Sequence, residues 1–339
     1  MITVRSEGIV LERTENEYEN QAVLNPACIE VGGATHMYYR AVSKDFVSSI
    51  GYCILHEGGI IERRDKPLLF PELEYEKRGV EDPRIVRLDG TYYLFYTVYD
   101  GKNALIAYAT SQDLVNFKKQ KVISPTISYE EAGRLMGLSH IREKYLFFES
   151  YIRDRAGRDI LVWEKDAFIF PRKINGRFAL VHRILPGIQV IYFDDFSQLS
   201  DTDYWKSYLK DLGKYVLLDP KYDFESRNIG GGCPPIETEE GWLFIYHAVE
   251  DCPGGRVYHA AAALFDLNNP MRLIGRLSEP LFSPCEEWEK VGDVNNVVFP
   301  TGAVIREGRL HIYYGAADRL IAAKSVDLRE LLHALKNNK

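Results

Sequence analysis

The sequence predicts an all-β fold, a five-bladed β-propeller with short helical insertions and a C-terminal helix. Three observations predict it: one strand pattern recurs five times, the copies have blade-sized spacings, and few stretches show helical periodicity. Each copy begins with a glycine that ends a turn, and continues as an aromatic-rich strand, a second turn and a second strand. This pattern is typical of β-hairpins, which are the building units of propeller blades.

The five copies are separated by 57, 86, 65 and 67 residues, and they begin at Gly33, Gly90, Gly176, Gly241 and Gly308. The first copy has the loosest pattern, whereas the second contains a clear Asp100-Gly101 turn. The 86-residue interval also holds a hairpin-like stretch from Lys144 to Trp163. That stretch lies too close to the third copy to form its own blade. We therefore interpret it as an insertion and count five blades.

Two segments have helical periodicity. One starts at Thr202 and places aromatic and leucine side chains on one stripe around Trp205. The other starts at Ser325, which we expect to be the N-cap of a C-terminal helix with a leucine face. We expect both helices to cap the propeller. No linker or low-complexity segment divides the chain, so we predict a single catalytic domain over residues 1–339.

Composition excludes several classes of protein. Of the 339 residues 46% are hydrophobic, which is enough for a large core, and the net charge of −7 disfavours a nucleic-acid binder. No run of 18 apolar residues could span a membrane, and the N-terminal segment lacks the apolar region of a secretion signal. The five cysteines are scattered without a CxxC pair, which disfavours a metal site and a disulfide framework. We therefore expect a cytoplasmic protein without a bound metal.

The strongest local motif is Gly79-Val80-Glu81-Asp82-Pro83-Arg84. Proline restricts the preceding residue, so we expect Asp82 to be extended and its carboxylate to point in a fixed direction. The neighbouring charges of Glu81 and Arg84 can set the pKa of that carboxylate. An ordinary turn and a surface ion pair before a strand would give the same six residues.

Basic residues form a second signal in this acidic chain. Lys165 precedes one aromatic-rich strand, and Arg183 and His247 lie in matching positions of successive copies. Charged side chains are costly to bury unless they are paired or face a ligand, and a propeller would direct both at one channel. Arginine binds phosphate or carboxylate in a bidentate manner. The alternative is that Arg183 forms a buried ion pair with a carboxylate of the protein.

A third signal lies near the C-terminus. Asp318 ends an apolar strand and has small neighbours, which leaves space for a ligand. Carboxylates and amides beside tyrosine rings suit sugar hydroxyls, although a simple turn between two strands would also explain this aspartate. The sequence contains neither GxSxG nor HExxH, and the run Gly230-Gly231-Gly232 lacks the context of a nucleotide-binding loop.

Taken in order along the chain, these motifs resemble glycoside hydrolase family 130, the inverting β-mannoside phosphorylases and related β-mannosidases. The resemblance runs from about residue 25 to residue 325. The matching segments are Asn25-Pro26-Ala27, Tyr39-Arg40-Ala41, 80–84, 96–101, 170–176, His182-Arg183, 230–238, Gly241-Trp242, Tyr246-His247, 292–300 and 313–318. The resemblance implies a five-bladed propeller, in agreement with the independent repeat count.

The resemblance also implies roles for individual residues. Asp82 matches the catalytic acid, which delivers its proton through a hydroxyl of the mannosyl unit. The residues matching sugar-binding positions are Asn25, Arg40, Tyr99, Asp100 and Asp318. Those matching phosphate-binding positions are Lys165, Arg183, His247 and Asn228. Inorganic phosphate is then the co-substrate, and no further cofactor is implied. One carboxylate suffices for this chemistry, because phosphate is itself an anionic nucleophile that the protein must hold in line.

The predicted function is therefore cleavage of β-linked manno-oligosaccharides, or of mannosyl-glucose type disaccharides, with phosphate to give α-mannose 1-phosphate. Two departures from the family pattern keep hydrolysis by an inverting β-mannosidase open. Asn228 stands where a lysine is usual, and Lys165 where an arginine is common. We expect the insertion at 124–165 to shape the acceptor side, and the helix near Trp205 is a candidate contact in a homo-oligomer.

Two further alternatives remain. One is a non-catalytic carbohydrate-binding propeller. The other is an inverting glycosidase of a neighbouring five-bladed clan that acts on arabinosides or fructosides. Such a site needs an early carboxylate, for which the first copy offers Glu30 and Asp45 without the expected flanking motif.

Overall fold

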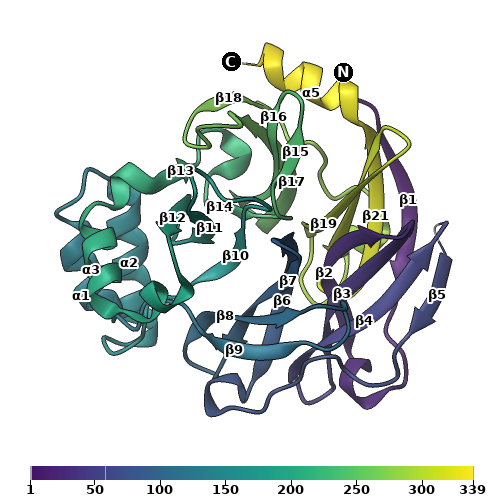
Figure 1. Cartoon of the computed structure of the whole chain (residues 1–339), viewed down its shortest axis with the longest axis horizontal. Coiled ribbons are helices and arrows are strands. Elements are labelled where there is room, and N and C mark those ends of the chain that lie inside the picture. The colour runs from purple at the N-terminus through teal and green to yellow at the C-terminus, as the bar shows by residue number, and fades with distance from the viewer. Residues whose placement is uncertain (1, 58, 339) are drawn as a thin grey trace.

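The computed structural model describes residues 2–57 and 59–338, and strands dominate it. Its sheets are arranged around a common centre, with a group of helices outside them (Figure 1). The first strand of the chain belongs to the same sheet as the last three, in the order β1-β21-β20-β19. These strands are β1 (Val4–Leu11), β19 (Val298–Arg306), β20 (Arg309–Ala316) and β21 (Leu320–Asp327). The first and last strands of the chain are thereby held in one sheet.

The largest sheet has eight strands but consists of two hairpin-built groups. The first group is β2 (Ala22–Val31), β3 (Ala34–Val42), β4 (Ser48–His56) and β5 (Gly59–Arg63). The second is β6 (Gly79–Leu88), β7 (Thr91–Tyr99), β8 (Ala104–Ser111) and β9 (Lys118–Val122). Within each group the pairing is antiparallel, whereas a single parallel pair between Ser48 and Gly79 joins the two groups.

Two more sheets follow along the chain. One has the order β10-β11-β12-β13, with β10 (Lys165–Ile169), β11 (Phe178–Arg183), β12 (Ile188–Phe193) and β13 (Val216–Leu218). The other sheet has the strand order β14-β16-β17-β18, and β15 also pairs with β16. Its strands are β14 (Asn228–Gly231), β15 (Ile236–Thr238), β16 (Gly241–Cys252), β17 (Gly255–Phe265) and β18 (Leu273–Arg276).

The predicted repeat glycines occupy equivalent places in these sheets. Each begins, or lies one or two residues before, the first strand of a hairpin, and each has a positive φ, between 75° and 146°. The strands that follow them are β3, β7, β11, β16 and β20. Glycine adopts this left-handed backbone without a steric penalty, so it ends the turn and lets the aromatic strand begin. The predicted hairpins at these five positions are confirmed.

Helices lie outside the sheets, and two of the sequence predictions about them were wrong. The stretch from Lys144 to Trp163 is not hairpin-like, because most of it forms α2 (Glu143–Ala156), which follows α1 (Tyr129–Met136). Tyr145, Phe148 and Ile152 are buried and recur with helical spacing. An aromatic-rich segment was thus misassigned, because short apolar runs are ambiguous between strand and helix.

The other predicted helices form, with a correction to one cap. The segment from Thr202 is α3 (Thr202–Lys210), and a short α4 (Glu287–Lys290) precedes the C-terminal α5 (Leu328–Asn337). Ser325 lies within β21 and does not cap α5. Asp327 does so instead, because its carboxylate accepts a 2.9 Å hydrogen bond from the backbone N–H of Glu330.

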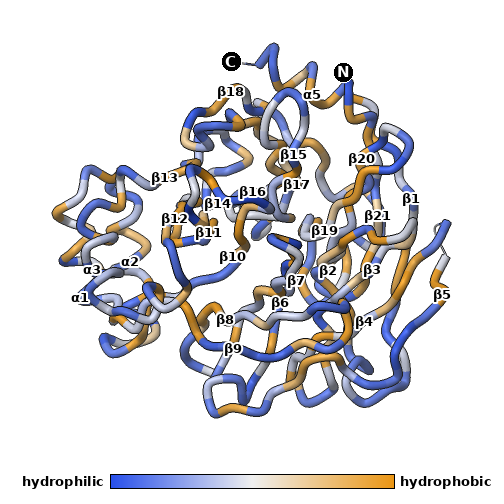
Figure 2. The backbone as a smooth tube through the Cα atoms, viewed as in Figure 1, coloured by the Kyte–Doolittle hydropathy of each residue, from blue (hydrophilic) through white to orange (hydrophobic). Residues whose placement is uncertain are grey.

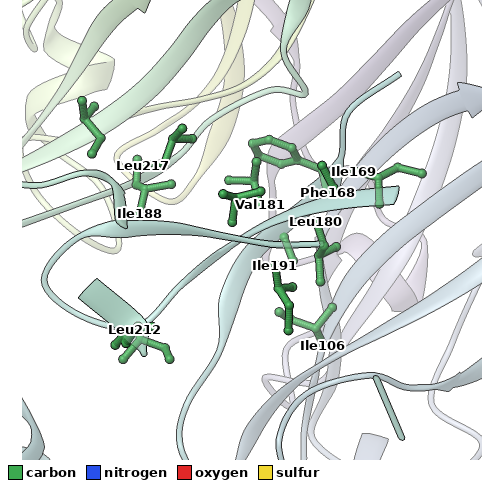
Figure 3. Close-up of a cluster of buried hydrophobic side chains, with 14 of the residues drawn as sticks. Ile106, Phe168, Ile169, Leu180, Val181, Ile188, Ile191, Leu212 and Leu217 are labelled. Carbon is green, nitrogen blue, oxygen red and sulfur yellow. The ribbon is translucent and has the colours of Figure 1, made fainter. Parts of the chain in front are cut away.

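The largest apolar cluster joins the sheet β10–β13 to its neighbours and to the helices (Figure 3). In Figure 3 Ile106 of β8 lies among side chains of β10, β11 and β12, including Phe168, Leu180 and Ile191. Colouring by hydropathy shows hydrophobic and hydrophilic residues mixed along the strands, and hydrophilic residues also reach the centre next to β7 and β16 (Figure 2). Within the described ranges, helices long and apolar enough to cross a membrane are absent.

Candidate active site

Three of the strands that begin a sheet group contain the same backbone feature. In β2, β6 and β10 the strand register shifts around Asn25, Asp82 and Asp166 respectively, and each of these residues has a φ between 49° and 60°. A bulge of this kind redirects one side chain out of the normal alternation of the strand. Asparagine and aspartate tolerate the left-handed region better than most residues, which explains their presence at these positions.

Asp82 is buried, and its carboxylate is held from two other strands. Its Oδ1 accepts a 2.8 Å hydrogen bond from Asn25 Nδ2 and lies 3.5 Å from Arg40 NH1. Burial by itself would raise the pKa of Asp82, but the positive charges of Arg40 and Lys165, together with the Asn25 hydrogen bond, lower it to about 2. The carboxylate is therefore ionised at neutral pH when no ligand is bound.

The expectation that Asp82 is extended was wrong. Its φ of 51° lies in the left-handed region, even though a proline follows. Asn25 precedes Pro26 and has a φ of 49°, so the two bulges share one unusual X-Pro conformation. Residues held in sparsely populated regions cluster at functional sites, where the surrounding structure fixes them. The direction of the Asp82 carboxylate is fixed, as predicted, but by a bulge.

Arg40 and Lys165 converge on Glu81, the residue before Asp82. Glu81 is buried, with Oε1 2.9 Å from Arg40 NH2 and Oε2 3.4 Å from Lys165 Nζ. Ser48 Oγ accepts a further 2.9 Å hydrogen bond from Arg40 Nε. The Arg40 and Lys165 side chains retain 23% and 31% exposure, so both can still meet a ligand.

A second cluster surrounds Asp166. This carboxylate is buried, with Oδ1 3.5 Å from Arg84 NH2 and Oδ2 2.8 Å from Arg183 NH1. Arg84 is fully buried and also donates to the backbone carbonyls of Gly232 and Pro83. The suggested alternative for Arg183, a buried ion pair with a carboxylate, is thus present in this structure. Arg183 nevertheless keeps 16% exposure, and its buried Nε has no partner among the described residues.

His247 differs from the expectation of a cation. It is fully buried, and burial lowers its pKa to about 3, so the ring is neutral at physiological pH. Its Nε2 lies 3.3 Å from Arg183 NH1, and a neutral ring nitrogen can accept that hydrogen bond. Phe299 packs against the ring at a centroid distance of 4.3 Å. His247 therefore orients Arg183 by a neutral hydrogen bond.

Asp318 joins the site from the turn between β20 and β21. It has a φ of 54° and is partly exposed. Burial is the largest influence on its pKa, and with the nearby negative charge of Asp82 it outweighs Arg40 and raises the pKa to about 6. Two carboxylates of the site therefore have pKa values displaced in opposite directions.

Three predicted site residues have other contacts. Tyr99 donates to the Gly101 carbonyl, and the Asp100 carboxylate accepts hydrogen bonds from the backbone of Lys102 and Asn103. Both side chains thus stabilise the turn after β7. Asn228 is buried in β14, and no side-chain hydrogen bond from it to Arg183 or His247 occurs within residues 2–57 and 59–338.

Sequence reasoning gave Glu81 only an influence on the pKa of Asp82, missed its contacts with Arg40 and Lys165, and assigned no role to Asp166. A signal for Asp166 was available, because Lys165-Asp166 begins one strand group much as Glu81-Asp82 lies in another. In both pairs a charged residue precedes a left-handed aspartate. Comparing the copies position by position would have placed Asp166 beside the site.

Comparisons with known proteins agree with this geometry. The Glyco_hydro_130 family, described as beta-1,4-mannooligosaccharide phosphorylase, matches residues 2–337. Two curated proteins of Thermoanaerobacter sp. (strain X514) are similar. A 1,2-beta-oligomannan phosphorylase is 32% identical over 95% of this chain and 96% of its own length, and a beta-1,2-mannobiose phosphorylase is 34% identical over 92% of each. The fold resembles the beta-1,2-mannobiose phosphorylase of Listeria innocua, with a TM-score of 0.73, 22% identity and coverage of 99% and 100%.

Proposed function

The chain belongs to glycoside hydrolase family 130, and from that premise we propose that it is an inverting β-mannoside phosphorylase. It cleaves β-linked manno-oligosaccharides, or mannosyl-glucose type disaccharides, with inorganic phosphate and releases α-mannose 1-phosphate. The observation that carries this proposal is the buried Asp82 carboxylate together with two partly exposed cations, Arg40 and Lys165, whose charges lower its pKa. Asn25 Nδ2 donates to the same carboxylate at 2.8 Å.

Partly exposed side chains of the site suit the two substrates. A sugar hydroxyl can bond to Arg40, whose side chain is 23% exposed, and a phosphate oxygen can accept from Arg183, whose side chain is 16% exposed. Lys165 adds a second, partly exposed cation close to Asp82. An inverting reaction with phosphate needs an acid on the leaving oxygen and an anionic nucleophile on the opposite face of the sugar. Asp82 supplies the acid, and Lys165 and Arg183 hold the nucleophile in line.

Asp82 must carry a proton before it can act, whereas the free site keeps it ionised. Phosphate brings negative charge to the cations that lower its pKa, Lys165 among them. Bound phosphate therefore raises the pKa of Asp82 and favours its protonation. The proton then passes to the leaving oxygen through a hydroxyl of the mannosyl unit, the bond from the anomeric carbon to that oxygen breaks, and a phosphate oxygen forms the new bond to the anomeric carbon.

We propose that the sheets form a five-bladed propeller in one domain over residues 1–339. The strand groups β2–β5, β6–β9, β10–β13, β14–β18 and β19–β21 with β1 support five blades, since among the described residues the first two groups are joined by one parallel strand pair. The proposed reaction uses phosphate as co-substrate and needs no other cofactor. A cytoplasmic location and a homo-oligomeric state stay predictions.

The decisive test is phosphate dependence. The protein is incubated with β-1,2- and β-1,4-mannobiose, with and without inorganic phosphate, and the products are separated by anion-exchange chromatography. Phosphorolysis predicts α-mannose 1-phosphate and no cleavage in the absence of phosphate. Comparing the two linkages also identifies the preferred substrate.

Hydrolysis by a β-mannosidase is the second candidate, and one observation favours it. The Asp166 carboxylate already contacts Arg183, and Asn228 gives the site no cation at its position. Release of free mannose at the same rate in both incubations would establish hydrolysis and reject phosphorolysis. Binding of the disaccharide without any product would instead indicate a carbohydrate-binding protein.

A further inference from the structure

Glu81 makes contacts that its neighbour Asp82 cannot replace. One carboxylate oxygen lies 2.9 Å from Arg40 NH2 and the other 3.4 Å from Lys165 Nζ. Arg40 comes from β3 and Lys165 from β10, so this side chain connects two different sheets. Its own exposure is 4%, and a carboxylate this deeply buried needs such partners to remain charged.

The backbone around Glu81 is shaped to hold this bridge. A Cβ at Gly79 would come within 3.0 Å of both Glu81 Oε1 and Ser48 Cβ. The bare glycine backbone therefore leaves the space in which the Glu81 carboxylate folds back beneath Arg40. Ser48 also holds the same guanidinium, with its Oγ 2.9 Å from Arg40 Nε. Arg40 is held at Nε and NH2, which leaves NH1 directed at Asp82.

We infer that Glu81 is a positioning residue that ties the sugar-facing Arg40 to the phosphate-facing Lys165 and holds both beside Asp82. This inference rests on the proposed function. Glu81 touches neither substrate, but it couples the two halves of the site through its two oxygens. Its negative charge also opposes the effect of the two cations on Asp82, and so favours the protonated acid that the reaction requires.

The charged and polar groups that face Asp82 come from several elements. They are Asn25 of β2, Arg40 of β3, Arg84 of β6, Lys165 of β10, His247 of β16 and Asp318 of the β20–β21 turn. Removing the charge of Glu81 leaves Arg40 and Lys165 less compensated, which stabilises the Asp82 carboxylate. The acid then loses its proton at a lower pH. The alkaline side of the kcat profile should move in that direction.

The test compares Glu81→Gln and Glu81→Asp with the wild-type protein in phosphorolysis, with phosphate and β-mannobiose as substrates. Glu81→Gln should lower kcat about 30-fold and move the alkaline limb to lower pH by about one unit, since positioning and acid strength are both affected. The phosphate KM should change less than about fivefold, because two effects oppose each other. Without the Glu81 carboxylate Lys165 is held less firmly, which raises KM, but Lys165 also no longer pairs with a competing anion, which lowers KM. Glu81→Asp keeps the charge, so its alkaline limb should stay in place.

Glu19→Gln is the matched control. Glu19 is also fully buried and pairs with an arginine, Arg63, at 2.8 Å, but it lies outside the proposed site. Its pH profile should match that of the wild type even if its Tm falls. A double-mutant cycle adds Lys165→Gln. If Glu81 acts partly through Lys165, the effect of Glu81→Gln on kcat should shrink at least threefold in that background.

Two results would overturn the inference. One is a Glu81→Gln enzyme whose kcat and pH profile match those of the wild type. The other is a fall in kcat that equals the fall in folded fraction, with full additivity in the double-mutant cycle. A wild-type protein that releases mannose without phosphate would reject the proposed function instead. In that case the pH limb of Glu81→Gln hydrolysis still decides the role of Glu81.

Discussion

Asp82 and Asp166 both project from a β-bulge, but their surroundings differ. Each lies at a left-handed bulge in the first strand of a sheet group, and each follows a charged residue. Asp82 meets an amide and a partly exposed guanidinium, from Asn25 and Arg40. Asp166 meets two arginines, and one of them, Arg84, has no exposure at all.

A bulge determines which side chain of a strand points to the centre of the molecule. The contacts that this side chain makes with neighbouring strands then determine its role. Around Asp82 an exposed path to ligand remains through Arg40 and Lys165. Asp166 is instead the counterion of the fully buried Arg84, which would be costly to leave uncompensated, and of the partly exposed Arg183. One aspartate is therefore suited to chemistry and the other to holding the phosphate-facing arginine.

The largest effect should come from removing the acid. Asp82→Asn keeps the shape and a residue type that tolerates positive φ, but cannot donate the proton. We expect the phosphorolysis rate to fall about 10³-fold, within the range for loss of a general acid. The free energy of unfolding should fall by about 2 kcal/mol, because the lowered pKa of Asp82 shows that its charge stabilises the folded state. Initial rates and urea unfolding measure the two quantities. Near wild-type turnover would remove Asp82 from its role.

Asp166→Asn should mainly affect stability. Removal of its charge leaves Arg84 buried without its carboxylate, so we expect the free energy of unfolding to fall by about 3 kcal/mol. Urea denaturation beside Asp82→Asn provides the direct comparison. If Asp166→Asn is the more stable of the two variants, Asp166 is not a counterion on which the buried Arg84 depends.

Loss of the Arg183 charge should specifically weaken the binding of phosphate. Arg183→Gln should raise the phosphate KM about 10- to 100-fold, the equivalent of a charged hydrogen bond worth about 1.5–3 kcal/mol. Arg177→Gln is the control, because Arg177 belongs to the same hairpin but pairs with Asp194 on the surface. Equal phosphate KM values for the two variants would contradict a phosphate contact.

The smallest effect should be the pH-dependent stability of Asp318→Asn. The pKa of Asp318 is raised to about 6 from 3.8, so the folded state holds its proton more tightly than the unfolded chain. This aspartate therefore costs stability as the pH rises from about 4 to 6. We expect the variant to gain roughly 1–2 kcal/mol at pH 8, discounted for partial exposure, and nothing at pH 3.5. A gain at pH 3.5 equal to that at pH 8 would refute the raised pKa.

Much of the fold could be predicted because its signals are local. The turn glycines, the aromatic strands after them and the helix at Thr202 each follow from a few adjacent residues. The stretch after Lys144 was misassigned since its aromatic residues suit strand and helix equally, and burial against α1 decided between them. Asp100 matched a sugar-binding motif, yet its carboxylate binds the backbone of its own turn.

By itself, the sequence determined the repeated hairpins, the cations placed within apolar strands and Asp82 as the candidate acid. Only the tertiary structure decided that Glu81 bridges Arg40 and Lys165, that Asp166 pairs with Arg183, and that His247 is neutral. The physical reason is that charge and pKa depend on neighbours within a few ångströms. Those neighbours come from other strands, and the chain brings them together only when the sheets close around one centre.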